Sequence, residues 1–421
     1  MAMYIKRIYL KNIRCFKDKT VEFKKKGISK LFCGDNGEGK STFLKAIAMG
    51  LCDQASAAAL HRELPGEFIR DKAPKNKNGY KEGAIDIELA DGRNRYNIVT
   101  TLVSLEAFEE IKQQVRINGE LSESRDFPWK KLFVSGYGAG IRAAGTSDFR
   151  DYVPVDSVYP LFRYDVPLQN PELAFRRITT KPKNYYGSLS QYRYSKKVSK
   201  HVKGLLLRIL DLQPTDEIEL TETGLDLVRG GETFELNSQG DGHKAMSTLI
   251  LDLLSWWMIY VKLNDQIFLE NLEVQGIVLI DEVEQHLHPR WQIRIMKLLK
   301  EQFPGVQFII TTHSPLVISG CDQFDVYRVT DESDHPMSVY GWLAEDVYDW
   351  MGLESSRAPA YVHDTLRRFE HLDEKRLRKT ISKTEHTELR RLRKVLKGLP
   401  STDIARLTVH FRNYQKLLRR R

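Results

Sequence analysis

The residues with the clearest chemical purpose lie in a glycine-rich segment, GDNGEGKST, at positions 34–42. Its glycines permit the positive φ angles that turn successive backbone N–H groups inward around a phosphate. In this pattern a lysine reaches the β- and γ-phosphates of a nucleotide, and the following hydroxyl coordinates Mg²⁺. We therefore predict a phosphate-binding loop for ATP, with contacts from Asn36, Gly37, Gly39, Lys40, Ser41 and Thr42.

The segments on either side of this loop fit the strand–loop–helix order that such a site requires. "KLFCG" is a short apolar run typical of a buried strand. The residues after the loop place Phe43, Leu44, Ile47 and Leu51 on one helical face. An ordinary glycine-rich turn is the alternative, but it would not need both neighbours, so the order favours a nucleotide site.

A second strand-like segment supplies carboxylates. Ile277–Ile280 form a continuous apolar run, which predicts a central parallel strand. Asp281 follows, where it can hold Mg²⁺ together with Ser41, and Glu282 can polarise the water that attacks the γ-phosphate. A metal site on one strand face is the alternative for this segment, with the ligands Glu282, Glu284, His286 and His288.

A histidine follows a third buried run. "VQFIITTHSP" predicts a strand whose carboxyl end carries His313. Ligands of open α/β folds bind at that edge of the sheet. We therefore predict that His313 joins Lys40 and Glu282 as a catalytic residue, although a histidine satisfied by a local hydrogen bond would give the same pattern.

The remaining hydrophobic pattern predicts how the chain is organised. Residues 4–23 alternate apolar and polar, as in an antiparallel hairpin, and residues 80–103 suggest two strands around the turn Asp91-Gly92. We expect four regions: an ATPase lobe at 1–150, a helical or irregular insertion at 151–204, a second ATPase lobe at 205–345, and a basic helical tail at 346–421.

The formal charge of +9 is unevenly distributed over the 421 residues. Residues 361–421 contain 18 Lys/Arg against 7 Asp/Glu, so the rest of the chain is close to neutral. No apolar stretch is long enough to span a bilayer, and no signal peptide is expected. The four cysteines form no C-x-x-C pair. These features predict a cytoplasmic location, free thiols and no membrane partner.

In combination, "GDNGEGKST", "YGAGIR", "LIDEVEQHLHP" and "TTHSP" resemble the motifs of ABC-type ATPases of the SMC, RecF and OLD-like group, over roughly residues 1–330. The resemblance implies an α/β fold, namely an ABC-type P-loop ATPase with a mixed central sheet, an N-terminal antiparallel β portion, a helical insertion and a C-terminal helical tail. It also implies ATP and Mg²⁺ as cofactors.

The resemblance assigns family roles to particular positions. Lys40 and Ser41 would be the Walker A residues, Asp281 and Glu282 the Walker B pair, and His313 the switch histidine. Residues 284–289 would form the D-loop. Tyr137 and Gly138 stand where the family has its glutamine loop, but neither is a glutamine.

The family also has a signature, S-x-G before a helix, which closes over ATP from the opposite subunit. "NSQGDGHKAMSTLILDLLSW" resembles it in two possible registers. One aligns Gly242 and Lys244 and puts Gly240 at the serine position, whereas the other aligns Ser238 and Gly240. Either register implies a homo-oligomer, a dimer or higher, through an ATP sandwich. A core helix capped by Ser238 or Asp241 is the alternative.

Three members of the group fit poorly. A transporter ATPase would usually show L-S-G-G-Q, which is absent. An SMC protein needs long heptad arms, and only about 200 residues separate the two halves of the site. An OLD-type enzyme would have a nuclease domain after the ATPase, but the segment after Tyr340 has no D-x-D and no clustered carboxylates.

The chain is most similar to the PtuA-like ATPase subunits of Septu and retron-associated anti-phage systems. This resemblance implies an ATP-binding and hydrolysing subunit of a defence complex, which senses or holds nucleic acid and controls a separate nuclease or toxin effector. A RecF-like ATPase of DNA repair or recombination is the alternative.

Two segments are candidates for docking such partners. The tail has apolar seams at helical spacing, and these helices could instead pack on each other or on the ATPase lobe. Residues 181–203 hold seven Lys/Arg and no acid, with interspersed tyrosines, which suits nucleic acid or a solvated lid. The seams are Leu389, Leu392, Leu396 and Leu399, and Ile404, Leu407, Phe411, Tyr414 and Leu418.

Overall fold

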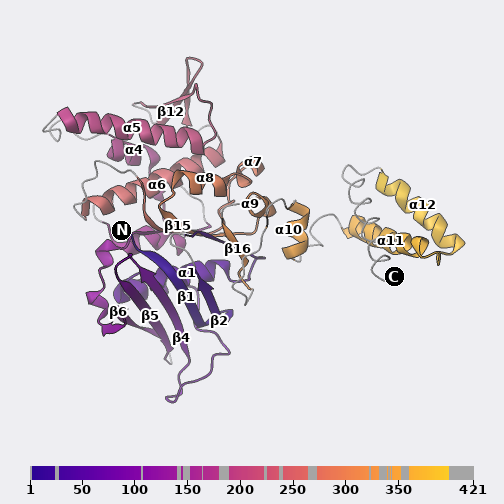
Figure 1. Ribbon diagram of the computed structural model, residues 1–421, viewed down its shortest axis with the longest axis horizontal. Coiled ribbons are helices and arrows are strands. Elements are labelled where there is room, and N and C mark those ends of the chain that lie inside the picture. Colours follow the sequence, from indigo (N-terminus) through magenta and orange to yellow (C-terminus); the bar gives the residue numbers. More distant parts are fainter. Residues whose placement is uncertain are drawn as a thin grey trace. The chain divides into compact units, whose positions relative to one another are not determined.

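The computed structural model describes most of the chain. The described residues are 2–23, 28–105, 108–139, 144–145, 152–163, 165–179, 189–221, 225–236, 240–263, 273–321, 324–330, 339, 342, 344–351 and 360–397. The chain divides into two compact units, Met1–Ala344 and Glu345–Arg421 (Figure 1).

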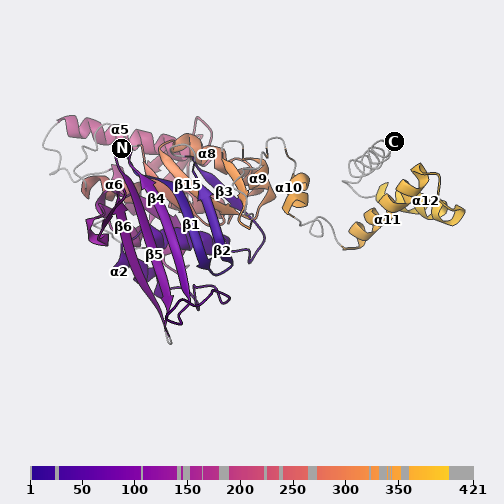
Figure 2. The same ribbon diagram turned by 60° about the horizontal axis from the view of Figure 1, so that its bottom comes forward.

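Six strands of the first unit form an antiparallel sheet in the order β2-β1-β4-β5-β6-β7 (Figure 2). Their bounds are β1 Tyr4–Ile13, β2 Phe16–Glu22, β4 Glu82–Ala90, β5 Arg95–Ser104, β6 Glu109–Ile117 and β7 Glu120–Ser122. The two antiparallel pairs predicted from the sequence, within residues 4–23 and around Asp91-Gly92, are confirmed. Burial alternates along β4 and β5, because one face of this sheet covers the core.

Five strands form a parallel sheet in the order β16-β3-β15-β14-β8. Their bounds are β3 Lys30–Cys33, β8 Val134–Tyr137, β14 Gly276–Ile280, β15 Val306–Thr312 and β16 Asp325–Arg328. All residues of β3, β8, β14 and β15 are buried, as expected for strands covered on both faces. The parallel strand predicted at 277–280 is thus confirmed. The sequence predicts a mixed central sheet, but among the described strands this sheet is parallel throughout, and the predicted N-terminal antiparallel portion is the first sheet.

The helix α1, Lys40–Gly50, lies between the two sheets. Every residue from Phe43 to Gly50 is buried. At its end, a Cβ on Gly50 would lie 2.6 Å from Cδ1 of Ile87 on β4, so glycine permits a close approach to the antiparallel sheet. One apolar cluster joins α1 to the inner face of the first sheet and to β14 and β15.

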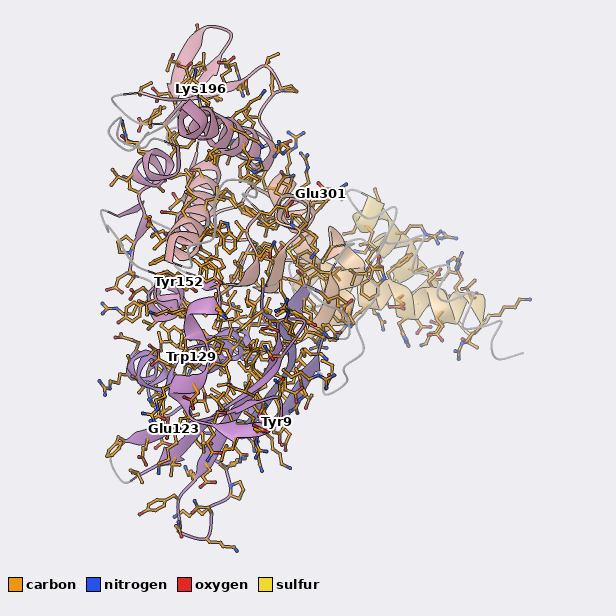
Figure 3. The ribbon with its side chains drawn as sticks, turned by 60° about the vertical axis from the view of Figure 1, so that its left-hand side comes forward. Tyr9, Glu123, Trp129, Tyr152, Lys196 and Glu301 are labelled. Atoms are coloured by element: carbon orange, nitrogen blue, oxygen red, sulfur yellow. The ribbon has the colours of Figure 1, made fainter. Side chains whose placement is uncertain are left out.

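Tyr152 closes the edge of the parallel sheet beside β8 (Figure 3). The N–H of Val134 donates to its hydroxyl at 2.8 Å, and the hydroxyl donates to the carbonyl of the same residue at 2.9 Å. The Tyr152 ring stacks on Phe133 with centroids 5.5 Å apart. The Tyr152 hydroxyl therefore satisfies the N–H and the carbonyl of Val134, which a further strand beside β8 would otherwise pair with.

The rest of the first unit is largely helical. Its helices are α2 Gln54–Arg62, α3 Pro154–Val158, α4 Pro171–Thr179, α5 Leu189–Ile209, α6 Asp241–Leu263, α7 Pro289–Gln292, α8 Ile295–Gln302 and α9 Pro315–Ser319, with 3-10 turns at Ser124–Asp126, Trp129–Lys131 and Tyr159–Leu161. Its short strands are β9 Ala144–Gly145, β10 Leu168–Gln169, β11 Glu217–Leu220, β12 Leu225–Arg229 and β13 Glu232–Glu235. No described helix has the length and apolar character needed to cross a membrane.

The tail contains α10 Ala344–Met351, α11 Ala360–Leu377 and α12 Lys383–Lys397. The last two pack together through a small apolar cluster of Phe369, Leu372, Leu389 and Leu396, with Leu392 at its margin. Ion pairs Arg368–Glu388 and Lys375–Glu385 show that they run antiparallel. Leu389, Leu392 and Leu396 of α12 therefore pack within the tail, which is the alternative considered for the predicted seam.

Several predicted docking residues lie outside the described part of the chain. These are Leu399, the seam of Ile404, Leu407, Phe411, Tyr414 and Leu418, and residues 181–188 of the basic, tyrosine-rich segment. Residues 189–203 of that segment belong to α5.

Candidate nucleotide site

The loop predicted to bind phosphate connects the end of β3 to the start of α1. Gly37 and Gly39 have φ angles of 87° and 95°, which glycine adopts at little cost. Gly39 precedes the helix, and no side chain caps it. The N–H groups of the first turn are therefore suited to an anion. Of the predicted ligands, Asn36 lies in the loop, and Ser41 and Thr42 lie in this turn.

Two charged side chains fold back over the loop. Lys40 is 5% exposed, and its Nζ donates to the carbonyls of Gly34 and Asp35 at 2.9 and 3.0 Å. Glu38 accepts the N–H of Asp35 at 2.8 Å. A Cβ at position 34 would lie 2.3 Å from Oε2 of Glu38, so with any other residue here this carboxylate would have to move away from the N–H of Asp35. The lysine ammonium is thus already held against the loop.

Asp281 follows β14 and is fully buried. Thr311, near the end of the neighbouring strand β15, donates its hydroxyl to Oδ1 of Asp281 at 2.5 Å. The N–H of Asp281 donates to the carbonyl of Tyr137 on β8, at 2.8 Å. The strand β15 therefore holds the carboxylate, and β8 holds the backbone of Asp281, at the carboxyl end of the parallel sheet.

Glu282 has a φ of 45°, a conformation that residues with a side chain rarely adopt. Its N–H donates to the same Thr311 hydroxyl at 2.9 Å, so one threonine contacts both acidic residues. The amide of Gln285 donates to Oε2 of Glu282 at 2.9 Å. The side chain is 20% exposed and can therefore be reached by water.

His313 lies immediately beyond the end of β15, within reach of two carboxylates. Its Nδ1 is 3.0 Å from Oε1 of Glu284 and 3.8 Å from Oε1 of Glu282. The hydrogen bond with Glu284 raises the pKa of His313 above its ordinary value, against the effects of burial and of the Lys40 charge. The structure thus brings the predicted catalytic residues Lys40, Glu282 and His313 to one edge of the sheet.

Tyr137, at the predicted glutamine-loop position, faces the interior. It is 1% exposed, and its hydroxyl lies 3.0 Å from Oδ2 of Asp252 on α6. The other oxygen of Asp252 accepts the N–H of Gln169 at 2.9 Å. Burial raises the pKa of Asp252 to about 6, although these hydrogen bonds lower it. Tyr137 therefore links the parallel sheet to α6.

The predicted signature segment leads into α6, which begins at Asp241. Gly240 is exposed with a φ of 114°, and a Cβ on Gly242 would lie 3.1 Å from the carbonyl oxygen of His286. Gly242 therefore packs on the predicted D-loop. Ser238 lies outside the described residues.

A cavity of about 900 Å³ opens at the start of α6. Its lining includes Gly240, Gly242, His286 and Arg294, and the rings of His243 and Trp291, whose centroids are 4.7 Å apart. No residue of the phosphate-binding loop lines it. The signature segment and the loop therefore do not share this cavity in the described structure.

The alternative metal site does not form in the described residues. Residues 281–286 form turns rather than a strand, so Glu282, Glu284, His286 and His288 do not share a strand face. Within the described ranges, no group of three His, Cys, Asp or Glu side chains could hold a metal ion.

Three residues of the site were not predicted to act there: Thr311, Glu284 and Gln285. Thr311 was detectable as a polar residue at the end of a buried strand. Glu284 was noted only as a possible metal ligand or as the start of the D-loop. Its contact with His313, 29 residues away, depends on the pairing of β14 with β15.

Residues 7–203 match a family described as "AAA domain", and residues 212–319 match one described as "AAA domain, putative AbiEii toxin, Type IV TA system". The Septu protein PtuA of Bacillus mycoides (strain KBAB4) is 26% identical over 322 residues, which cover 75% of this chain and 39% of that protein. The chain thus spans about two fifths of the length of that relative.

Two further matches extend over a larger share of the matched protein's own length than the match to PtuA does. The Retron Vc95 probable ATPase of Vibrio cholerae serotype O1 biovar El Tor is 26% identical over 376 residues, which cover 72% of this chain and 69% of that one. The SMC head domain from Thermotoga maritima is 16% identical, with a TM-score of 0.46, and the match covers 80% of this chain and all of that one.

The two AAA matches together include the phosphate-binding loop, Asp281, Glu282 and His313. Both parts of the site therefore lie in segments that match AAA-domain families, and the chain is similar in sequence to the Septu protein PtuA and to the Retron Vc95 probable ATPase.

Proposed function

We propose that this chain binds ATP with Mg²⁺ and hydrolyses it. The observation that carries the proposal is the convergence of Lys40, Glu282 and His313 at the carboxyl edge of the parallel sheet. Lys40 would leave the carbonyls of Gly34 and Asp35 and bind the β- and γ-phosphates. Glu282 would polarise the attacking water, and His313 would contact the γ-phosphate.

Ser41 and Asp281 would hold the metal ion in this proposal. They provide a hydroxyl and a carboxylate oxygen, which are ligands that Mg²⁺ prefers, with phosphate oxygens and water at the other positions. The Thr311 hydroxyl already orients the carboxylate of Asp281. The ion would neutralise charge that develops on the phosphates.

We further propose that the chain serves as the ATPase subunit of an anti-phage complex and controls a separate nuclease or toxin. Its relatives are named for Septu and retron systems. The basic tail is the candidate for holding the effector or nucleic acid, because its surplus of Lys/Arg suits phosphates.

The purified chain is expected to hydrolyse ATP without degrading DNA or RNA, in the presence of Mg²⁺ or Mn²⁺. The measurement pairs phosphate release with gel analysis of labelled nucleic acids. Nuclease activity that a point mutation in this chain abolishes would contradict the proposal that a separate subunit supplies the nuclease.

In cells, deletion of the gene is expected to raise phage plaque counts. A RecF-like role would instead increase sensitivity to DNA damage.

We also propose that ATP joins two protomers, with the start of α6 from one closing over the phosphate-binding loop of the other. The cavity beside Gly240 and Gly242 supports this, because no residue of the chain's own loop lines it. The N-terminus of α6 would present N–H groups to the partner's phosphates.

ATP is therefore expected to convert the Glu282→Gln variant into a dimer or higher even-numbered oligomer, which light scattering would detect. This variant is chosen because slow hydrolysis preserves the bound nucleotide. The matched control is Lys40→Ala with the same ATP concentration, which should not assemble. A monomer at micromolar Glu282→Gln protein and saturating ATP would exclude the sandwich.

A further inference from the structure

Glu284 is almost completely buried beside His313. It is 5% exposed, and its Oε1 accepts the N–H groups of His313 and Ser314 at 2.6 and 3.1 Å. The same oxygen lies 3.0 Å from Nδ1 of His313. Within the described structure, the buried Oε2 has no hydrogen-bond partner. One carboxylate oxygen therefore holds both the backbone and the ring of the histidine.

The contact between Glu284 and Nδ1 of His313 determines which ring nitrogen remains available to a ligand. A carboxylate only accepts hydrogen bonds, so Nδ1 of His313 must carry a proton. The nitrogen left for a ligand is Nε2. In the neutral ring Nε2 would be an acceptor and would repel a phosphate oxygen, whereas in the imidazolium it donates.

The charged groups around His313 favour the imidazolium. The hydrogen bond and charge of Glu284 raise its pKa, as does the charge of Glu282, whereas burial and the charge of Lys40 lower it. Burial alone would raise the pKa of Glu284, but hydrogen bonds from His313 and from backbone N–H groups lower it overall. At neutral pH Glu284 is therefore ionised, as this pairing requires.

We propose that Glu284 is a positioning residue, which holds His313 through Nδ1 so that Nε2–H is presented to the terminal phosphate of the nucleotide. The inference rests on the proposed ATPase function and adds a residue through which the switch histidine acts. Glu284 also begins the predicted D-loop, where the His286 carbonyl contacts Gly242. Glu284 therefore connects His313 to the predicted D-loop, which contacts the start of α6 at Gly242.

The raised pKa of His313 predicts how the rate of ATP hydrolysis should depend on pH. Because the pKa of His313 is raised, the imidazolium persists to higher pH than for an ordinary histidine and is lost as pH rises through the raised value. Glu284→Gln removes the negative charge but retains an oxygen that can accept the three N–H groups. The falling limb of the pH–rate profile should therefore move to lower pH by about one unit, as is typical for loss of a neighbouring carboxylate.

The experiment has two readouts. NMR titration of the His313 ring in the nucleotide-free protein, assigned with His313→Gln, measures its pKa in the wild type and in Glu284→Gln. Steady-state ATP hydrolysis gives kcat as a function of pH for the same proteins. We expect both midpoints to fall together in Glu284→Gln. Glu301→Gln, an exposed change on α8 (Figure 3), is the matched control and should change neither.

The outcomes separate this inference from the proposed function. If the wild type hydrolyses ATP but Glu284→Gln keeps the wild-type ring pKa and pH profile, Glu284 has no positioning role. If no protein hydrolyses ATP, the proposed function fails, and the ring titration still decides whether Glu284 and His313 are paired. If Glu284→Gln does not fold, Glu284→Asp replaces it. That variant keeps the charge but shortens the side chain and weakens the hydrogen bond to Nδ1, so kcat and the midpoint of the falling limb should both fall. Wild-type values of both would overturn the inference.

Discussion

The Glu282→Gln variant is expected to hydrolyse ATP roughly 10² to 10⁴ times more slowly than the wild type, the range typical for loss of a general base. The amide keeps the shape of the side chain but does not polarise water. Its oxygen can still accept the hydrogen bond from Gln285, and the backbone bond to Thr311 is untouched. ATP affinity should therefore be nearly unchanged.

Phosphate release and equilibrium binding of a fluorescent ATP analogue would measure the two effects separately. Glu301→Gln is the control, because it makes the same chemical change on a side chain that is 44% exposed. Turnover at the wild-type rate in Glu282→Gln would mean that another group activates the water.

The Lys40→Ala variant is expected to lose ATP affinity by roughly 10- to 100-fold. Hydrogen bonds to a charged group contribute about 1.5–3 kcal/mol, and each 1.4 kcal/mol corresponds to a factor of ten. The readout is the rise in unfolding temperature that saturating ATP produces in the wild type, which should nearly disappear at the same ATP concentration.

Lys40 also holds the Gly34 and Asp35 carbonyls in the nucleotide-free chain, so the unfolding temperature without ATP must be measured as well. Lys297→Ala, which removes a half-exposed lysine from α8, controls for loss of charge. Unchanged ATP affinity in Lys40→Ala would remove the lysine from the phosphate site.

The parts of the site that could be predicted are those encoded by local pattern. The glycines and lysine of residues 34–42 specify a loop, and the apolar runs before Asp281 and His313 specify buried strands. Once those strands are parallel, their carboxyl ends must meet at one edge. The predicted placement of Lys40, Asp281, Glu282 and His313 therefore needed no knowledge of individual contacts.

The parts that could not be predicted depend on contacts between distant residues. Tyr137 and Asp252 are 115 positions apart, and nothing near either residue indicates that their side chains meet. The sequence left the start of α6 open between Ser238 and Asp241, because several glycine and polar residues there could each end the preceding loop. The leucines of α12 have the same spacing whether they contact α11 or another protein.

The enclosed position of α1 has a mechanical consequence. The helix starts at Lys40 and ends at Gly50 against Ile87 of the antiparallel sheet. At 1.5 Å per residue this is a rod of about 16 Å. Close-packed neighbours on both sides leave such a rod little freedom to bend, so a shift of its first turn must displace its far end. A displacement of the phosphate loop would therefore be felt at the antiparallel sheet, about 16 Å away, and not only beside the nucleotide.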